Sequence, residues 1–313
     1  MFASLLPLLF VQAAAAQAIG RTQPDPRSPT EIVEAAPTSD WRQIAAEDML
    51  VMELAGGRRV VVQLMPAPFA RAWIGNIRTL ATAEWWDGTS INRVQDNYVV
   101  QWGDASEKKS LPPGLSAANE SDYSVPATSL NPREMTRGPA DVYARSTYFY
   151  RGWPIAGDEG WPKGGVQKGF ARGSRAWPVH CYGTVGVGRD VSPNTGTGAE
   201  LYAVIGHAPR HLDRNIAVVG RVIAGIEHLS SLPRGTVGLG FYARPEQRVP
   251  IERLRLASAL PLAERPRFEY LATDSPTWAR YASARANRKD AFFIQPAGAA
   301  DICNIPVPVR AIP

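Results

Sequence analysis

The composition predicts a loop-rich β or α/β protein, and two observations lead to this prediction. The 313 residues include 27 glycines and 27 prolines, which is a high content for a helical protein. Short apolar runs bounded by turn residues recur along the chain, as in proteins built from strands. Hydrophobic residues make up 45% of the sequence, enough for a sizeable core, and the length allows one or two domains.

Charge and cysteine content exclude several classes of protein. The formal net charge is +5, and the basic residues are scattered, so nucleic acid is not expected as a partner. The only cysteines are Cys181 and Cys303, which rules out zinc ribbons, four-cysteine iron–sulfur sites and disulfide-scaffold folds. His207 and His211 stand four residues apart, but Pro209 argues against a helix that would align them on a metal. We therefore expect no metal and no cofactor.

The N-terminus has the pattern of a secretory signal. Residues 5–11 form an apolar run, and Ala16-Gln17-Ala18 fits a small-x-small cleavage site. No other apolar stretch approaches the length needed to span a bilayer. We expect cleavage after Ala18 and a periplasmic mature protein without stable membrane insertion.

The next segments contain linker, hairpin and helix signals. Residues 19–44 are expected to form a linker, since their first part is rich in proline, serine and threonine. Residues 49–54 and 58–64 are apolar runs joined by Ala55-Gly56-Gly57, which predicts a hairpin. A helix is expected over residues 68–82.

The helix prediction rests on periodicity. Phe69, Trp73, Ile77 and Leu80 follow one another at spacings of 4, 4 and 3, which places them on one helical face. Shorter helices are expected at residues 225–232 and from Ser275-Pro276 to about residue 288. Further strands are expected at residues 98–102, 182–188, 201–205, 216–222 and 251–256.

Residues 105–178 form a long irregular stretch with many glycines and prolines. The stretch also holds nine tyrosine, tryptophan and phenylalanine residues that include Tyr148, Phe149, Tyr150 and Trp153. Such aromatic content is typical of a segment that packs on a domain rather than of a flexible linker. We therefore expect an ordered excursion.

Three segments carry a resemblance to a known family. Residues 86–104 contain Trp-Asp-Gly-Thr, then Asn-Arg-Val, then Gln-Trp-Gly-Asp. Residues 180–190 and 211–213 follow, and residues 218–225 read Val-Val-Gly-Arg-Val-Ile-Ala-Gly. In this order the segments resemble the signature of cyclophilin-type peptidyl-prolyl cis-trans isomerases, in particular exported bacterial members with a long insertion.

The resemblance implies a mainly β fold: a closed eight-stranded antiparallel barrel capped by two helices. It also implies the following division of the chain. Residues 1–18 are the signal peptide, 19–44 the linker, 45–260 the isomerase domain with the insertion at 105–178, and 261–313 a C-terminal extension. The implied partners are proline-containing segments of unfolded or folding exported proteins.

The resemblance also implies a catalytic pair. Arg93 matches the family's catalytic arginine, and Gln101 matches the glutamine that holds the substrate carbonyl and orients the arginine. Rotation about an X–Pro bond must overcome about 18–20 kcal/mol of amide resonance. A guanidinium that hydrogen-bonds the pyramidal prolyl nitrogen favours the transition state over the planar ground state.

The remaining site residues are implied by position, and several depart from the family pattern. Tyr98, Val99 and Leu212 match the walls of the proline pocket, and His211 precedes the pocket leucine. Tyr202 stands where the family has phenylalanine at the pocket floor, so its hydroxyl needs a partner if buried. Glu200 replaces a glutamine and is expected either to pair with Arg93 or to orient it.

Two questions remain open at this point. Arg93 and Gln101 favour an active isomerase, whereas Glu200, Tyr202 and Arg189 favour a cyclophilin-fold binding or scaffold protein with little activity. An oxidising compartment would allow Cys181 and Cys303 to pair, but sequence gives no distance between them, and a cysteine is often simply a small buried hydrophobe.

Overall fold

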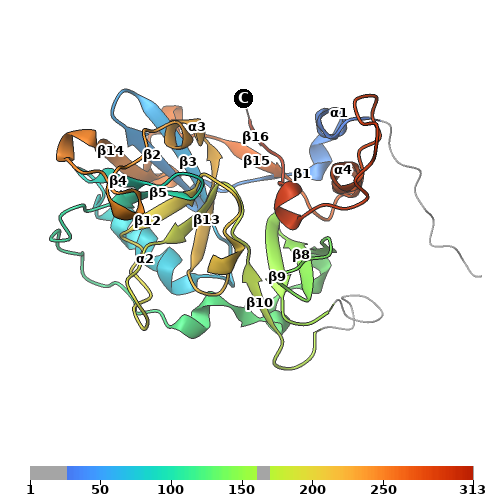
Figure 1. The fold of residues 1–313 in the computed structure, drawn as a ribbon, viewed down its shortest axis with the longest axis horizontal. Helices are drawn as coiled ribbons and strands as arrows, with labels where there is room; N and C mark the ends of the chain where they lie inside the picture. Colours follow the sequence, from blue (N-terminus) through green and yellow to red (C-terminus); the bar gives the residue numbers. More distant parts are fainter. Residues whose placement is uncertain (1–26, 161–169, 313) are drawn as a thin grey trace, which may run out of the picture.

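Eight antiparallel strands close into a barrel in the order β11–β12–β5–β4–β14–β2–β3–β13 (Figure 1). The computed structural model describes residues 27–160 and 170–312. This architecture confirms the predicted closed barrel. Its strands are β2 (Met49–Leu54), β3 (Arg58–Leu64), β4 (Ser90–Val94), β5 (Val99–Gly103), β11 (Thr184–Val187), β12 (Leu201–Val204), β13 (Val218–Ala224) and β14 (Val249–Leu256).

The opening hairpin and the first long helix follow the sequence prediction closely. β2 and β3 pair from Met49↔Gln63 to Leu54↔Arg58 around a turn in which Gly56 and Gly57 have positive φ. Helix α2 (Arg71–Thr82) begins three residues later than expected, because Ala70 adopts a left-handed conformation (φ 49°) that ends the preceding turn. The second expected barrel helix is the single turn α3 (Glu227–Ser230).

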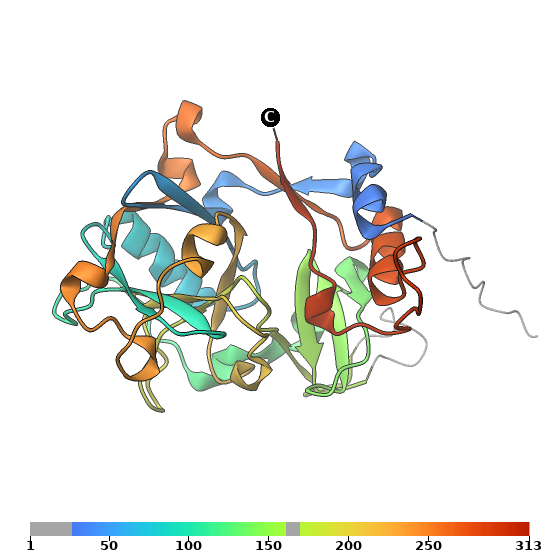
Figure 2. The same cartoon turned by 45° about the horizontal axis from the view of Figure 1, so that its top comes forward.

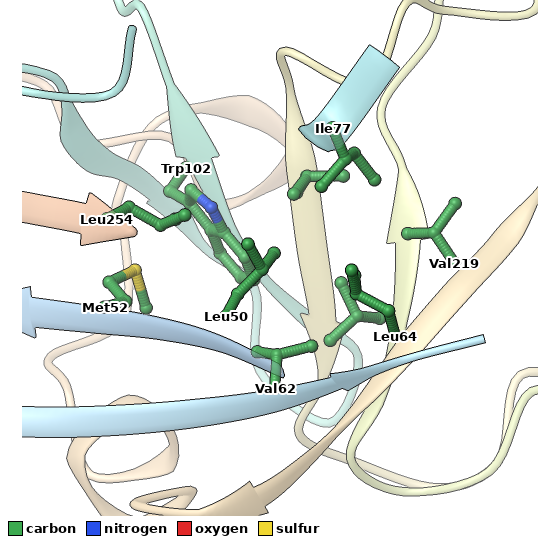
Figure 3. A pocket seen from close by; sticks show the side chains of 10 residues that line it. Leu50, Met52, Val62, Leu64, Ile77, Trp102, Val219 and Leu254 are labelled. Carbon is green, nitrogen blue, oxygen red and sulfur yellow. The ribbon is translucent and has the colours of Figure 1, made fainter. Parts of the chain in front are cut away.

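Side chains fill the barrel interior. Trp102 from β5 is 1% exposed and packs among aliphatic residues of β2, β3, β14 and helix α2 (Figure 3). The space left between these side chains is about 10 Å³, which is no more than one water molecule needs. The interior is therefore packed core, and a substrate must bind on the outside.

The long stretch after β5 contains regular structure that its sequence did not predict. Five strands form a second antiparallel sheet in the order β6–β10–β9–β8–β7. The expectation of an ordered segment is confirmed, but the description as irregular was wrong, because its strands are short and interrupted by glycine and proline. They are β6 (Val125–Pro126), β7 (Met135–Arg137), β8 (Ser146–Tyr150), β9 (Trp153–Gly157) and β10 (Arg175–Pro178).

The residues before and after the barrel come together in space. Strands β1 (Trp41–Gln43), β15 (Phe268–Leu271) and β16 (Val309–Ala311) form a three-stranded sheet between the barrel and the lobe that holds α1 and α4 (Figures 1 and 2). Helices α1 (Pro29–Glu34) and α4 (Pro276–Ala286) contact each other in that lobe.

The described part of the expected linker is therefore folded. Ile32 and Trp41 are buried in a second core with Phe149 of the insertion and Trp278 of the extension. The linker prediction for residues 27–44 was wrong because this short segment has too few apolar residues to show a period. It obtains its partners from the distant insertion and C-terminal extension.

A disulfide joins the extension to the barrel. Cys181 and Cys303 are bonded, with Cα atoms 5.2 Å apart, which is an ordinary separation for such a pair. The bond answers the question that the sequence left open. It fixes the C-terminal extension to the segment that connects β10 to β11.

No helix in the described residues, 27–160 and 170–312, is long and apolar enough to cross a membrane. The expected signal peptide and its cleavage site after Ala18 lie outside the described residues, so they stay predictions.

Candidate active site

Arg93 lies on the outside of the barrel at the centre of the predicted site. It sits on β4 directly opposite Gln101 on β5. Its guanidinium donates through Nε to the Leu239 carbonyl (2.7 Å), through Nη1 to Gln101 Oε1 (3.0 Å) and through Nη2 to Gln95 Oε1. These bonds use three of the five N–H donors of an arginine. The other two N–H donors of Arg93 make no hydrogen bond to the described residues and are left for a substrate.

Two aromatic rings fix the plane of this guanidinium. The Arg93 Cζ atom lies 5.8 Å from the centre of the Tyr98 ring and 5.5 Å from that of Phe241. Such contacts between a cation and a ring add attraction and restrict the rotation of the group. Partial burial lowers the pKa of Arg93, while Tyr98 and Tyr202 counteract this effect.

Phe241 reaches Arg93 because residues 235–242 attach to the last part of β4, beyond the two residues that pair with β14. The Gly235 amide donates to the Val94 carbonyl (2.9 Å), and the Tyr242 amide donates to the Asn92 carbonyl (3.0 Å). These two bonds flank Arg93 along the strand, so the segment presents the Leu239 carbonyl and the Phe241 ring to its side chain.

An apolar cluster next to Arg93 has the composition expected of a proline pocket. Val99, Tyr202 and Val204 are buried, and Tyr98, Leu212 and Ile216 are half-buried against them. The structure thus brings together the predicted Tyr98, Val99, Tyr202 and Leu212. His211 is exposed and stacks on the Tyr98 ring at 6.1 Å between ring centres, at the edge of this cluster.

Glu200 lies behind Gln101 rather than on Arg93. Its carboxylate takes hydrogen bonds from the Gln101 and Asn92 side chains and from the Asp104 amide. Burial raises the pKa of Glu200, and these hydrogen bonds only partly offset the effect. No ion pair joins Glu200 to Arg93 in the described residues. Of the two roles that the sequence left open, the geometry favours orientation of Arg93 through Gln101.

The comparison of the chain with protein-family models agrees with this geometry. The model described as "Cyclophilin type peptidyl-prolyl cis-trans isomerase/CLD" matches residues 50–256, which is more than half of the chain. The chain belongs to the cyclophilin family. The comparison with curated proteins found no match.

A solved cyclophilin structure shows the same fold. Cyclophilin AquaCyp293 from Hirschia baltica superposes with a TM-score of 0.64 at 21% identity, covering 87% of this chain and 94% of that one. The shared fold therefore extends beyond the residues of the family match. A Cryptosporidium parvum cyclophilin-type isomerase, solved in the presence of the dipeptide Ala-Pro, gives a TM-score of 0.38 at 11% identity, covering 66% of this chain and 98% of that one.

Several residues of this cyclophilin's site were not predicted from the sequence. Val204 has a signal, since it alternates with Tyr202 along β12 and so shares its face. Gln95 also has one, since it stands two residues after Arg93. Leu239 and Phe241 have none, because they reach Arg93 from almost 150 positions away. Arg189 is half-buried and donates to main-chain carbonyls, including that of Asn215 (3.0 Å).

Proposed function

We propose that this cyclophilin is an active peptidyl-prolyl cis-trans isomerase that accelerates rotation about X–Pro bonds in polypeptide chains. The observation that carries the proposal is the juxtaposition of Arg93 with the apolar cluster of Val99, Tyr202 and Leu212. A proline ring seated on the cluster would present its nitrogen to a charged donor whose plane is already fixed.

The chemistry needs only selective hydrogen bonding. As the X–Pro bond twists, the prolyl nitrogen becomes pyramidal and gains a lone pair that the planar amide lacks. A free N–H of Arg93 can donate to that lone pair, so the transition state is bound more tightly than the ground state. Gln101 fixes Nη1 from one side and the Leu239 carbonyl fixes Nε from the other. The arginine side chain therefore loses little conformational entropy when the substrate binds.

The experiment is an isomerisation assay on a short Ala-Pro peptide with the wild type, Arg93→Ala and Arg93→Lys. Removal of one preorganised transition-state donor costs about a hundredfold or more in rate. We expect such a loss for Arg93→Ala, and poor rescue by lysine because its single ammonium lacks the planar fork. The matched control is Arg78→Ala, which should retain activity. It removes an arginine of α2 that forms an ion pair with Asp48 (2.7 Å).

The second candidate function is a peptide-binding protein without catalysis. The observation that favours it is that Arg93 is already engaged. It donates hydrogen bonds to Leu239 and Gln95 and contacts the Phe241 ring, which together could keep the guanidinium from the substrate. Wild-type protein that binds the Ala-Pro peptide but leaves its isomerisation rate at the buffer value would establish this alternative and reject the isomerase.

We also propose that the protein is exported to the periplasm. Residues 1–18 have a signal pattern, and a disulfide such as Cys181–Cys303 is typical of an oxidising compartment. The mass of the intact protein recovered from its native cell envelope should correspond to a chain that begins at Ile19. A mass that retains residues 1–18 contradicts the proposal.

A further inference from the structure

A line of buried polar side chains connects the insertion to the cluster beside Arg93. Asp141 Oδ2 pairs with Arg210 Nη1 (2.7 Å), and Arg210 Nε donates to Asp213 Oδ2 (2.7 Å). Asp213 Oδ1 lies 3.0 Å from His180 Nδ1, and His180 Nε2 lies 2.9 Å from the Tyr202 hydroxyl. We call Asp141, Arg210, Asp213, His180 and Tyr202 the buried chain.

Burial of the buried chain is nearly complete. The side chains of Asp141 and Arg210 are 1% and 2% exposed, and His180 is 0% exposed. Burial opposes the charge of Arg210, but the carboxylates of Asp213 and Asp141 together raise its pKa. Charges removed from water in this way are retained at considerable cost unless they are paired, so each member depends on its neighbour.

The hydrogen bonds have one consistent direction. The Asp213 carboxylate can only accept, so His180 carries its proton on Nδ1. In the neutral imidazole Nε2 is then an acceptor, and the Tyr202 hydroxyl donates to it. Burial raises the pKa of Tyr202 well above its usual value, so the hydroxyl keeps the proton that it donates.

Gly186 provides the space that this bond requires. Gly186 on β11 is the register partner of Tyr202 on β12. A Cβ atom at position 186 would lie 2.3 Å from the Tyr202 hydroxyl oxygen, so any side chain would displace it. Tyr202 on β12 thus lies opposite Gly186 on β11, and its ring passes over the glycine so that the hydroxyl reaches His180.

The far end of the buried chain is fixed within the insertion. Asp141 Oδ1 accepts from the Tyr143 amide (2.6 Å), and the Tyr143 ring lies 4.9 Å from the Arg210 guanidinium carbon. Residues 141–143 therefore hold Arg210 from two sides. The insertion contributes one carboxylate and one ring to a network that ends at the cluster beside Arg93.

We propose that the buried chain positions Tyr202 as the floor of the proline pocket, so that the insertion controls how well the pocket receives a prolyl ring. The proposal rests on the proposed function only in taking the cluster of Val99, Tyr202 and Leu212 as that pocket. Asp141 and Tyr202 are positioning residues in this scheme, because Arg93 alone donates to the reacting nitrogen.

The test is a double-mutant cycle with Tyr202→Phe and Asp141→Asn, read as the Kd of an Ala-Pro peptide and as KM and kcat. Loss of one such hydrogen bond should weaken peptide binding about two- to tenfold. We expect each variant to raise Kd and KM with little change in kcat. The double variant should be no weaker than the single ones, because both break the same chain. Glu134→Gln, which removes the partly exposed ion pair of Glu134 with Arg151 (2.9 Å) in the same insertion, should leave Kd unchanged.

A measurement on the folded protein makes the test independent of catalysis and of variant stability. The ¹⁵N resonances of His180 should show a proton on Nδ1 and an acceptor Nε2 that shifts in Tyr202→Phe. If Nε2 is insensitive to Tyr202→Phe, or if the two substitutions multiply in their effect on Kd, the proposal is overturned. Unchanged Kd in Asp141→Asn also overturns it. An inactive wild type with this same pattern in Kd rejects only the isomerase function.

Discussion

Arg93 and Tyr202 lie at the same proposed pocket but are held by opposite kinds of interaction. Arg93 is half-buried, and its three acceptors are neutral: a carbonyl of Leu239 and the side-chain amides of Gln95 and Gln101. Tyr202 is 4% exposed and ends a buried chain that contains two carboxylates and an arginine. A donor that must act on a developing lone pair benefits from keeping its charge uncompensated, whereas a pocket floor needs only a fixed position.

The largest expected effect is the loss of stability on removal of the disulfide next to His180, the partner of Tyr202. Cys181 follows His180 directly, and its bond to Cys303 spans a sequence separation of 122 residues. In the chain-entropy model a link of this span contributes roughly 4–5 kcal/mol to stability. The double variant Cys181→Ser/Cys303→Ser should lose stability on that scale in urea unfolding, and it should bind the Ala-Pro peptide more weakly. Equal stability of the two proteins contradicts this prediction.

The addition of a single methyl group at Gly186 should show how tightly the Tyr202 hydroxyl is packed. Gly186→Ala places a Cβ against the Tyr202 hydroxyl, and overpacking of this kind costs about 1–3 kcal/mol. Gly75→Ala is the matched control, because nothing lies within 4 Å of its added Cβ and Gly75 is in the middle of α2. The control should gain about 0.5–1 kcal/mol from helix propensity. Chemical unfolding of both variants measures the contrast, which fails if Gly186→Ala is as stable as the wild type.

A substitution beside Arg93 should change the catalytic rate rather than the stability of the protein. Phe241→Ala removes one of the two rings beside the guanidinium while leaving its hydrogen bonds in place. A contact between a cation and a ring is worth about 0.5–2 kcal/mol, so kcat/KM should fall about two- to thirtyfold. The melting temperature should change little, because the side chain is 37% exposed. An increase in activity would instead show that Phe241 covers the arginine.

The smallest effect concerns Glu200 and depends on pH. Burial raises the pKa of Glu200 above its ordinary 4.5, so the native state holds this proton to higher pH than the unfolded chain. Over that window the native state binds more protons, and the free energy of unfolding falls as pH rises. Glu200→Gln lacks this contribution. The stability of the wild type relative to Glu200→Gln should therefore decrease from about pH 4.5 upward and then level off, as urea titrations at several pH values would show. A difference that is constant with pH contradicts the prediction.

The barrel and the strand-borne part of the site were predicted through the resemblance to the cyclophilin signature, whose motifs are short local segments of the sequence. Arg93, Tyr98 and Gln101 lie within nine residues, so their spacing along a hairpin already places them together. Asp141 and Phe241 could not be predicted, since each meets its partner across a long loop whose path depends on packing. Helix α1 was missed for the same reason, because its apolar partners are supplied by the C-terminal extension.

The strand order has a consequence for how the molecule can be assembled. β14, the last strand of the barrel in the chain, lies between β4 and β2, which are among the first. The hairpins β2–β3 and β4–β5 can be connected earlier through β13, β11 and β12, but the edges of β2 and β4 that face each other stay unbridged until residues 249–256 are available. Until then their edges remain open, and contacts of such high sequence separation form slowly. A growing chain of this protein carries the open edges of β2 and β4 for some 150 residues of synthesis, so closure of the barrel is a late event that waits for β14.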